Sequence, residues 1–140
     1  MEKQKYTAIV LAAGSGKRMN SKVHKQYLII QDRPVLYYSL KAFEDSAVDE
    51  IVLVVGKGEE KFCRKEIVDK YGISKVKAIV EGGKERYHSV FEGLKQTSDA
   101  DYVLIHDGAR PFVNQDIIRR CMQEVQKYQA CVVGLSLIHI

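Results

Sequence analysis

The first residues whose types and spacing could do chemistry form a glycine-rich segment near the N-terminus. Leu11 to Met19 reads LAAGSGKRM and follows directly on a run of apolar residues. Small residues let a backbone approach a ligand closely, and the N–H groups of a glycine turn can surround phosphate oxygens. Lys17 and Arg18 add positive charge. The segment could bind a phosphate, although two glycines alone are more often an ordinary strand-to-helix turn.

Two common glycine motifs do not fit this segment. A dinucleotide-binding fingerprint needs a third glycine where Met19 stands, and an acidic residue closing the second strand, where Val55 and Gly56 stand instead. A P-loop needs Gly-Lys-Ser/Thr after a four-residue gap, and Gly16-Lys17-Arg18 has neither the gap nor the hydroxyl. A nicotinamide-dependent enzyme is therefore only a distant alternative.

A second group, Lys25 and Gln26, lies farther along the same loop. Lys25 and Arg18 together would place two cations beside one phosphate, as a transferring phosphoryl group requires when charge builds on its non-bridging oxygens. Taken alone, Lys25 would be an ordinary surface lysine.

A third group is GGKERYHSV, residues 82 to 90, in which two glycines lead into a helical pattern. The first N–H groups of a helix are available to a ligand, and the Ser89 hydroxyl, one turn in, could donate to a base carbonyl. An ordinary capped helix start explains the pattern equally well. His88 is expected to be a surface histidine.

The fourth group is IHDGARP, residues 105 to 111. An aspartate at the carboxyl end of a strand, here Asp107, can bind Mg²⁺ that bridges phosphate oxygens. We expect His106 to be a packed strand residue. Pro111 favours an extended Arg110.

Short apolar runs alternate with helical periods along the chain, which predicts one α/β domain with a mainly parallel sheet and helices on both faces. The predicted strands span residues 6–12, 50–55, 76–80, 101–106 and 130 onward. Carboxyl ends of parallel strands meet at one edge of a sheet, where such folds bind ligands. The four groups are therefore expected to converge around one ligand.

Apolar residues three and four apart predict four helices. The clearest follows Asn114, a suitable N-cap, and has Asp116 in its first turn. A second predicted helix follows Gly83, and a third begins near Pro34. A weaker pattern predicts a fourth helix over residues 59–71. The apolar positions are Ile118, Cys121, Met122 and Val125; Tyr87, Val90, Phe91 and Leu94; Leu36, Leu40 and Phe43; and Phe62, Cys63 and Ile67.

Composition narrows the class of protein. The chain has 140 residues and a net charge of +4 with both signs scattered, so one domain without a nucleic-acid platform is expected. Cys63, Cys121 and Cys131 are too far apart for a zinc motif and suit core thiols in a reducing compartment. Without a signal peptide or a membrane-spanning run, a cytoplasmic location is expected.

Taken together, the Lys25-Gln26 pair, GGKERYHSV and HDGARP resemble the 2-C-methyl-D-erythritol 4-phosphate cytidylyltransferases of the non-mevalonate isoprenoid pathway. The resemblance runs from about Tyr6 to Gly134 and implies a Rossmann-like nucleotidyltransferase fold. It implies nucleotide contacts, partly through backbone groups, and roles for several charged side chains. The implied residues are Ala12, Ala13, Gly14 and Gly16 around the nucleotide; Gly83, Lys84 and Ser89 at cytosine; Arg18 and Lys25 on the reacting phosphate; Asp107 on the metal; Arg110 near the acceptor phosphate; and Arg86 as structural support.

The resemblance implies transfer of CMP from CTP to 2-C-methyl-D-erythritol 4-phosphate with release of pyrophosphate, and Mg²⁺ or another divalent cation as cofactor. It implies a homodimer for full-length members and no nucleic-acid or membrane partner. Ribitol 5-phosphate as acceptor, or CTP binding without turnover, are the alternatives.

Two positions depart from the pattern of the relatives. His24 stands where they commonly have proline, and residues 135–140 read LSLIHI where relatives read like Val-Pro-Val-Lys-Asp-Thr. Relatives also continue well past this length. We expect a chain that is incomplete at its C-terminus, through a truncated gene product or a foreign tail over 135–140. Such a chain would leave sheet edge and helix surface without partners and be prone to aggregation.

Overall fold

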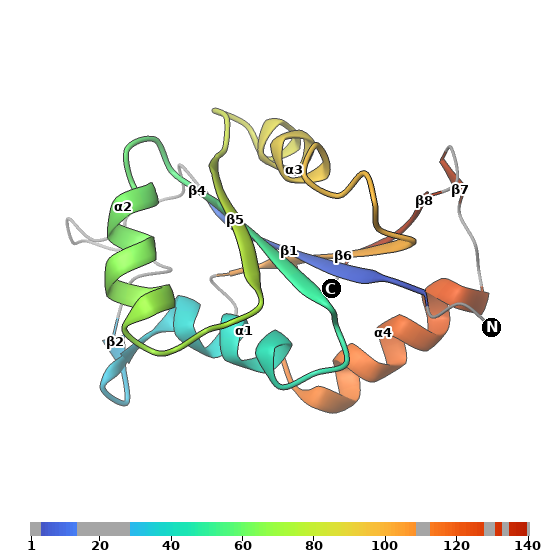
Figure 1. Cartoon of the computed structure of the whole chain (residues 1–140), viewed down its shortest axis with the longest axis horizontal. Coiled ribbons are helices and arrows are strands. Elements are labelled where there is room, and N and C mark those ends of the chain that lie inside the picture. The colour runs from blue at the N-terminus through green and yellow to red at the C-terminus, as the bar shows by residue number, and fades with distance from the viewer. Residues whose placement is uncertain (1–3, 14–28, 109–112, 128–130, 133–134, 140) are drawn as a thin grey trace.

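The computed structural model describes residues 4–13, 29–108, 113–127, 131–132 and 135–139 (Figure 1). Their centre is a six-stranded sheet with the order β5-β4-β1-β6-β8-β7. All neighbouring pairs are parallel except β7 and β8, which are antiparallel. The strands are β1 (Tyr6–Ala12), β4 (Glu50–Val55), β5 (Val76–Glu81), β6 (Tyr102–Asp107), β7 (Cys131–Val132) and β8 (Leu135–His139).

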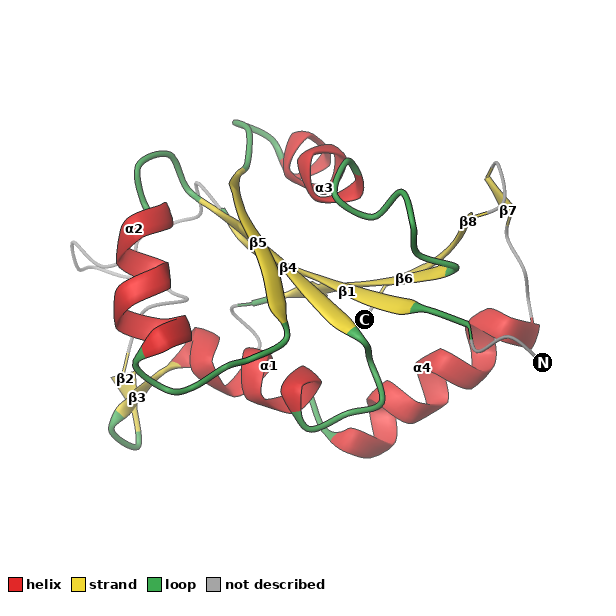
Figure 2. Ribbon diagram, in the orientation of Figure 1, coloured by secondary structure: helices red, strands yellow, loops and turns green. Residues whose placement is uncertain are grey.

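Helices cover both faces of this sheet, as Figure 2 shows. Successive residues of β1 point to opposite faces, so Ala8 and Val10 belong to one apolar cluster while Ile9 and Leu11 belong to another. The first cluster is closed by α1 (Val35–Glu44), α4 (Gln115–Lys127), α2 (Glu60–Cys63) and the π-helical turn η2 (Arg64–Asp69). The second is closed by α3 (Arg86–Leu94).

The predicted strands are largely confirmed. β1 and β4 have the predicted bounds, and β5 and β6 each end one residue later. Burial on both faces explains the agreement at β1, β4 and β6, because their residues are nearly all buried and mostly apolar. The segment from residue 130 onward forms two strands, and β8 lies parallel beside β6.

The predicted helix starts are confirmed at Asn114 and near Pro34. The Ile117 N–H donates to Asn114 Oδ1 at 2.9 Å, which is the expected N-cap bond. Pro34 precedes α1, whose Leu36, Leu40 and Phe43 are fully buried. In the weaker helix, Cys63 and Ile67 are buried as predicted, but Phe62 is 48% exposed.

The predicted buried face of α3 is wrong at two positions. Tyr87 and Phe91 are 68% and 53% exposed. The helix instead approaches the sheet along Ser89 and Gly93, both buried. A Cβ at Gly93 would lie 2.8 Å from Ile9 Cγ2, so only glycine permits this close approach. Val90 and Leu94 flank that line, and the two aromatic rings are turned outward.

A small hairpin, formed by β2 (Ile29–Ile30) and β3 (Arg33–Pro34), precedes α1. It lies at the end of the segment from Gly14 to Arg33, whose sequence has no long periodic pattern and predicts a loop. Gln31 and Asp32 connect its strands with positive φ angles of 49° and 72°.

Candidate functional site

The candidate site is built on the carboxyl ends of four parallel strands. Ala12 of β1 pairs with Val55 of β4, Val55 pairs with Glu81 of β5, and Leu11 pairs with Asp107 of β6. These strand ends are called the carboxyl edge below. Open α/β sheets present their ligand crevice here, and three of the four predicted groups have described residues at this edge.

The end of β1 touches the turn between β5 and α3. The Gly82 N–H donates to the Val55 carbonyl at 2.8 Å, which holds the turn against the sheet. A Cβ on Gly82 would lie 2.3 Å from Ser89 Oγ and 2.6 Å from Ala13 Cβ. Only the backbone of Gly82, which has no side chain, therefore lies between Ala13 and Ser89. The first and third predicted groups thus pack together and form one wall of the candidate site.

Ser89 lies at the base of this wall. It is 4% exposed, and its N–H donates to the Glu85 carbonyl at 3.2 Å within the first turn of α3. Its hydroxyl lies against the Gly82 turn, since a Cβ on Gly82 would be 2.3 Å from Ser89 Oγ. A fixed, buried hydroxyl beside a glycine turn is suited to recognising one edge of a planar base.

The remaining residues of the turn are exposed. Lys84 and Arg86 bring positive charge to it. His88 is a surface residue, as predicted, and its Nδ1 accepts a hydrogen bond from the Glu85 N–H at 3.3 Å. A Cβ on Gly83 would lie 2.3 Å from His88 Cβ, so Gly83 is also required by close packing. His88 therefore closes the helix start and shapes the turn.

The end of β6 joins the same edge. The Gly108 N–H donates to the Leu11 carbonyl at 2.8 Å, and a Cβ on Gly108 would lie 2.9 Å from Leu36 Cδ1. This contact fixes the backbone directly after Asp107, which is half-buried. The first and fourth predicted groups are therefore adjacent.

His106 is a packed strand residue, as predicted. It is 2% exposed, its Nε2 lies 3.0 Å from Ser39 Oγ, and its ring meets the Phe43 ring at a centroid distance of 5.6 Å. These contacts connect β6 to α1 immediately before Asp107.

Two glutamates near the carboxyl edge accept hydrogen bonds from the backbone of the turn after β4. Glu59 Oε1 accepts the Gly56 N–H at 3.0 Å, and Glu81 Oε2 accepts the Gly58 N–H at 2.7 Å. Both therefore fix the turn after β4. The described residues contain no cluster of three or more His, Cys, Asp or Glu side chains. Mg²⁺ in nucleotide sites commonly binds through one or two carboxylates together with phosphate oxygens, so a cluster of carboxylates is not required there.

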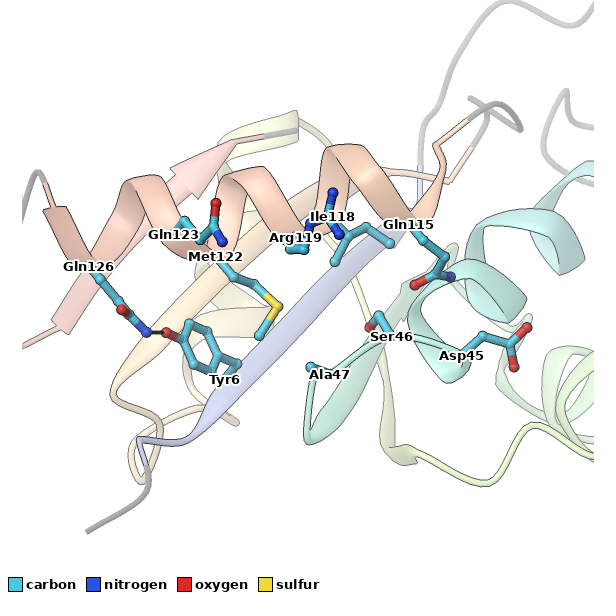
Figure 3. A pocket seen from close by; sticks show the side chains of 10 residues that line it. All are labelled: Tyr6, Asp45, Ser46, Ala47, Gln115, Ile118, Arg119, Met122, Gln123 and Gln126. Carbon is cyan, nitrogen blue, oxygen red and sulfur yellow. Dashed lines mark hydrogen bonds between the residues drawn. The ribbon is translucent and has the colours of Figure 1, made fainter. Parts of the chain in front are cut away.

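A cavity of about 390 Å³ lies elsewhere, between α4 and the turn after α1 (Figure 3). It opens beside Tyr6, at the start of β1, and thus at the other end of the strands. Its lining includes Ile118, Met122 and the Gln115 and Gln123 amides. None of the predicted site residues lines it, so it does not compete with the carboxyl edge as the candidate site.

Gly82 is in the third predicted group, but sequence reasoning did not single it out as a site residue. The Gly82-Gly83 pair signalled a turn, but its contacts with Ala13 and Ser89 depend on packing that no local pattern encodes. Gly14, Gly16, Arg18, Lys25 and Arg110 lie outside the described residues, so their roles remain predictions.

Known proteins identify the family. The model of the 2-C-methyl-D-erythritol 4-phosphate cytidylyltransferase family matches residues 6–138. The chain belongs to this family.

Curated members of the cytidylyltransferase family are similar over nearly the whole chain. The chain is 54% identical over 133 residues to the 2-C-methyl-D-erythritol 4-phosphate cytidylyltransferase of Lachnoclostridium phytofermentans, covering 95% of this chain and 57% of that protein. The enzyme of the same description from Lachnospira eligens is 54% identical over 129 residues, covering 91% and 56%. The chain therefore spans somewhat more than half the length of these relatives.

A solved structure agrees with the fold. The 4-diphosphocytidyl-2C-methyl-D-erythritol synthase of Anaerococcus prevotii superimposes with a TM-score of 0.72 at 33% identity, covering 89% of this chain and 52% of that one. The Rossmann-like nucleotidyltransferase fold predicted from the sequence is confirmed.

Among the described residues, no helix has the length and apolarity needed to cross a bilayer.

Proposed function

We propose that this chain forms the CTP-binding part of an enzyme that transfers CMP from CTP to 2-C-methyl-D-erythritol 4-phosphate and releases pyrophosphate. The contact of Ala13, Gly82 and Ser89 at the carboxyl edge is the main support. It joins the glycine-rich segment to GGKERYHSV, one of the segments by which the chain resembles its family. The Gly108 contact with Leu11 sets HDGARP, another of those segments, beside them.

Cytosine is the proposed ligand of the wall around Ser89. The buried hydroxyl and the backbone groups of Gly83 and Lys84 would pair with the base edge, while Ala12 and Ala13 leave room for the nucleotide. Fixed donors give discrimination, because a base with the wrong pattern leaves buried polar groups unpaired.

Asp107 is the proposed ligand of a divalent cation. A single carboxylate at a strand end suits Mg²⁺, which usually binds through one or two carboxylates together with phosphate oxygens. When bound, the ion would neutralise charge on the triphosphate.

The proposed reaction is in-line attack by a phosphate oxygen of the acceptor on the α-phosphorus of CTP, with pyrophosphate leaving. The acceptor phosphate is already ionised at neutral pH, so no general base is needed. Arg18 and Lys25 would stabilise the charge that builds on the α-phosphate, and Arg110 would hold the acceptor phosphate. Catalysis then depends on alignment and electrostatics.

CTP binding without transfer is the second candidate, because the contacts around Ser89 support a nucleotide site and do not by themselves supply transfer chemistry. Calorimetry with MgCTP and an assay of pyrophosphate release, with methylerythritol phosphate and ribitol 5-phosphate as acceptors, separate these functions. Release with the first acceptor supports the proposal. Release only with the second assigns the other acceptor, and binding without release supports the second candidate.

Ser89→Ala tests the cytosine site directly. Losing one hydrogen bond to the base should weaken MgCTP binding by about fivefold, since such a bond contributes on the order of 1 kcal/mol. It should also reduce the preference for CTP over UTP. The matched control is Ser98→Ala, because Ser98 is exposed and outside the site. Equal affinities in wild type and Ser89→Ala would contradict the assignment.

A further inference from the structure

A buried polar pair, Ser39 and His106, lies beside the proposed metal ligand Asp107. Ser39 is fully buried and His106 is 2% exposed, and His106 Nε2 lies 3.0 Å from Ser39 Oγ. The His106 ring also meets the Phe43 ring edge to face, at a centroid distance of 5.6 Å. The pair therefore joins β6 to α1 one residue before Asp107.

The surroundings of this pair are apolar. In the sheet His106 pairs with Val10 of β1. The apolar cluster on this face contains Val10 together with Leu36, Leu40 and Phe43. A hydrogen bond buried in such a core adds little net stability, and apolar groups of the same shape can often replace both partners at almost no cost. Stability alone therefore does not require this pair, whereas a directional polar contact does specify one arrangement of the strand end.

Asp107 lies on the opposite face of β6 from His106. Successive residues of a strand alternate between the two faces, and accordingly Leu104 belongs to the apolar cluster under α1 while Ile105 belongs to the cluster under α3. The same alternation gives His106 its contact with α1 and places Asp107 on the α3 face. The two helices cover opposite faces of the sheet, as Figure 2 shows. His106 thus anchors the end of β6 on the face away from Asp107.

The residue after Asp107 is held by the same helix. The Gly108 N–H donates to the Leu11 carbonyl at 2.8 Å, and a Cβ on Gly108 would lie 2.9 Å from Leu36 Cδ1. Leu36 and Ser39 are three residues apart in α1 and therefore lie on one face of it. One helix face thus contacts the residues immediately before and after Asp107.

We propose that His106 is a positioning residue for Asp107. Its contacts with Ser39 and Phe43 fix the end of β6, and this keeps the Asp107 carboxylate in one place for a divalent cation. The inference rests on the proposed function, in which Asp107 binds that cation. His106 itself is not a catalytic residue, since it faces α1.

The test measures how much a divalent cation contributes to the CTP affinity of the 140-residue chain. Calorimetry gives the dissociation constant of CTP with Mg²⁺ and again with EDTA, and the ratio of the two is called the metal contribution. This ratio separates an effect on Asp107 from a general loss of stability.

The variant His106→Leu/Ser39→Ala replaces both polar partners with apolar groups, so neither is left buried without the other. It should weaken MgCTP binding about fivefold, less than the roughly 10- to 100-fold effect of groups bonded directly to a metal ligand, because His106 acts through the backbone. CTP binding in EDTA should not change, since the wall around Ser89 is untouched.

Two further variants sharpen the assignment. In an Asp107→Asn background the same double change should cost less than about twofold, because its effect passes through the Asp107 carboxylate. His106→Gln alone should keep part of the metal contribution, since a glutamine amide can still bond to Ser39 Oγ.

Val48→Ala is the matched control for a loss of core packing. Val48 is 1% exposed and belongs to the same apolar cluster, but it precedes β4 at the other end of the strands. This variant should lower the midpoint of thermal unfolding and leave the metal contribution unchanged.

A normal metal contribution in His106→Leu/Ser39→Ala would overturn the inference and leave the proposed function intact. Equal losses with Mg²⁺ and with EDTA, equal losses in both Asp107 backgrounds, or a reduced metal contribution in Val48→Ala would also overturn it. If the double variant does not fold, as judged by its thermal unfolding curve, Ser39→Ala replaces it and the same pattern is expected.

The wild-type chain tests the proposed function separately. A chain that binds CTP equally with and without Mg²⁺ would overturn the assignment of Asp107, and this inference with it, but not the cytosine site. A chain that does not bind MgCTP at all would overturn the proposed function as well.

Discussion

Charged and polar groups are arranged differently at the two edges of the parallel sheet. At the start of the strands, here called the amino edge, Lys5, Glu50, Lys77 and Asp99 form a closed ring of alternating charge. Lys5 and Lys77 each lie 2.9 Å from a Glu50 oxygen, Lys77 lies 3.4 Å from Asp99, and Lys5 also bonds to Asp99. Every charge in this ring has an opposite partner.

At the carboxyl edge, the described contacts that join the strand ends involve glycines and backbone amides. Gly82 and Gly108 bring backbone close to side chains, and the exposed Lys84 adds charge to the turn. Polar groups therefore have two different roles at the two edges. Charges that neutralise one another stabilise the fold, while an edge built from close-packed backbone can accept an anion.

Replacing the predicted phosphate-binding cations should have the largest effect. The loss should be in turnover and not in stability. In a protein of the full length of its relatives, Arg18→Ala or Lys25→Ala should lower turnover on the order of 10²- to 10³-fold, the cost of removing an electrostatic stabiliser. Lys57→Ala is the control, since Lys57 is an exposed cation in the turn after β4. Near-normal turnover in both variants, measured by pyrophosphate release, would refute their role.

Gly82→Ala should harm both binding and stability. The added methyl group would lie 2.3 Å from Ser89 Oγ and 2.6 Å from Ala13 Cβ, and such overpacking typically costs about 1–3 kcal/mol. Urea unfolding should show that loss, and MgCTP binding should weaken. Adding Ser89→Ala removes one of the two clashes and should recover part of the stability. Wild-type stability of the single variant would show that Gly82 is not a close-approach position.

The sequence predicted the strands better than the surfaces between elements. β1 and β4 could be located because burial on both faces leaves continuous apolar runs. The outward turn of Tyr87 and Phe91 could not be predicted, because their spacing is that of a core face. The close approach of Gly93 to Ile9 decides the orientation of α3, and that approach is a tertiary contact.

The candidate site divides in the same way. Motifs predicted Ser89 and Asp107 as site residues, because chemistry-bearing residues followed predicted strands. They did not show which glycine separates Ala13 from Ser89. The ion ring of the amino edge was missed altogether, because Lys5 and Asp99 are 94 positions apart and each resembles an ordinary solvated charge. Partners this distant in sequence are set by the fold.

A change at the amino edge should have the smallest effect. It should alter stability in a pH-dependent way and leave CTP binding unchanged. Burial disfavours the Glu50 carboxylate, but hydrogen bonds from Lys77 and Lys5 outweigh it and lower the pKa of Glu50. The folded protein therefore holds this proton less tightly than the unfolded chain. The ring's contribution is present above the ordinary carboxyl pKa of about 4.3 and is lost as pH falls through the lower, folded value.

Glu50→Gln should lower the free energy of unfolding by about 1 kcal/mol near neutral pH, the upper range for partly exposed pairs. The difference between the variant and wild type should shrink on acidification from pH ~6 to pH ~3, because the wild-type carboxylate then loses its charge. MgCTP affinity at neutral pH should not change, since the ring lies at the opposite ends of the strands from Ser89 and Asp107. Urea titrations at several pH values give the first result and calorimetry the second. A pH-independent difference would show that Glu50 acts by packing, and a loss of CTP affinity would show that the two edges are not separate in function.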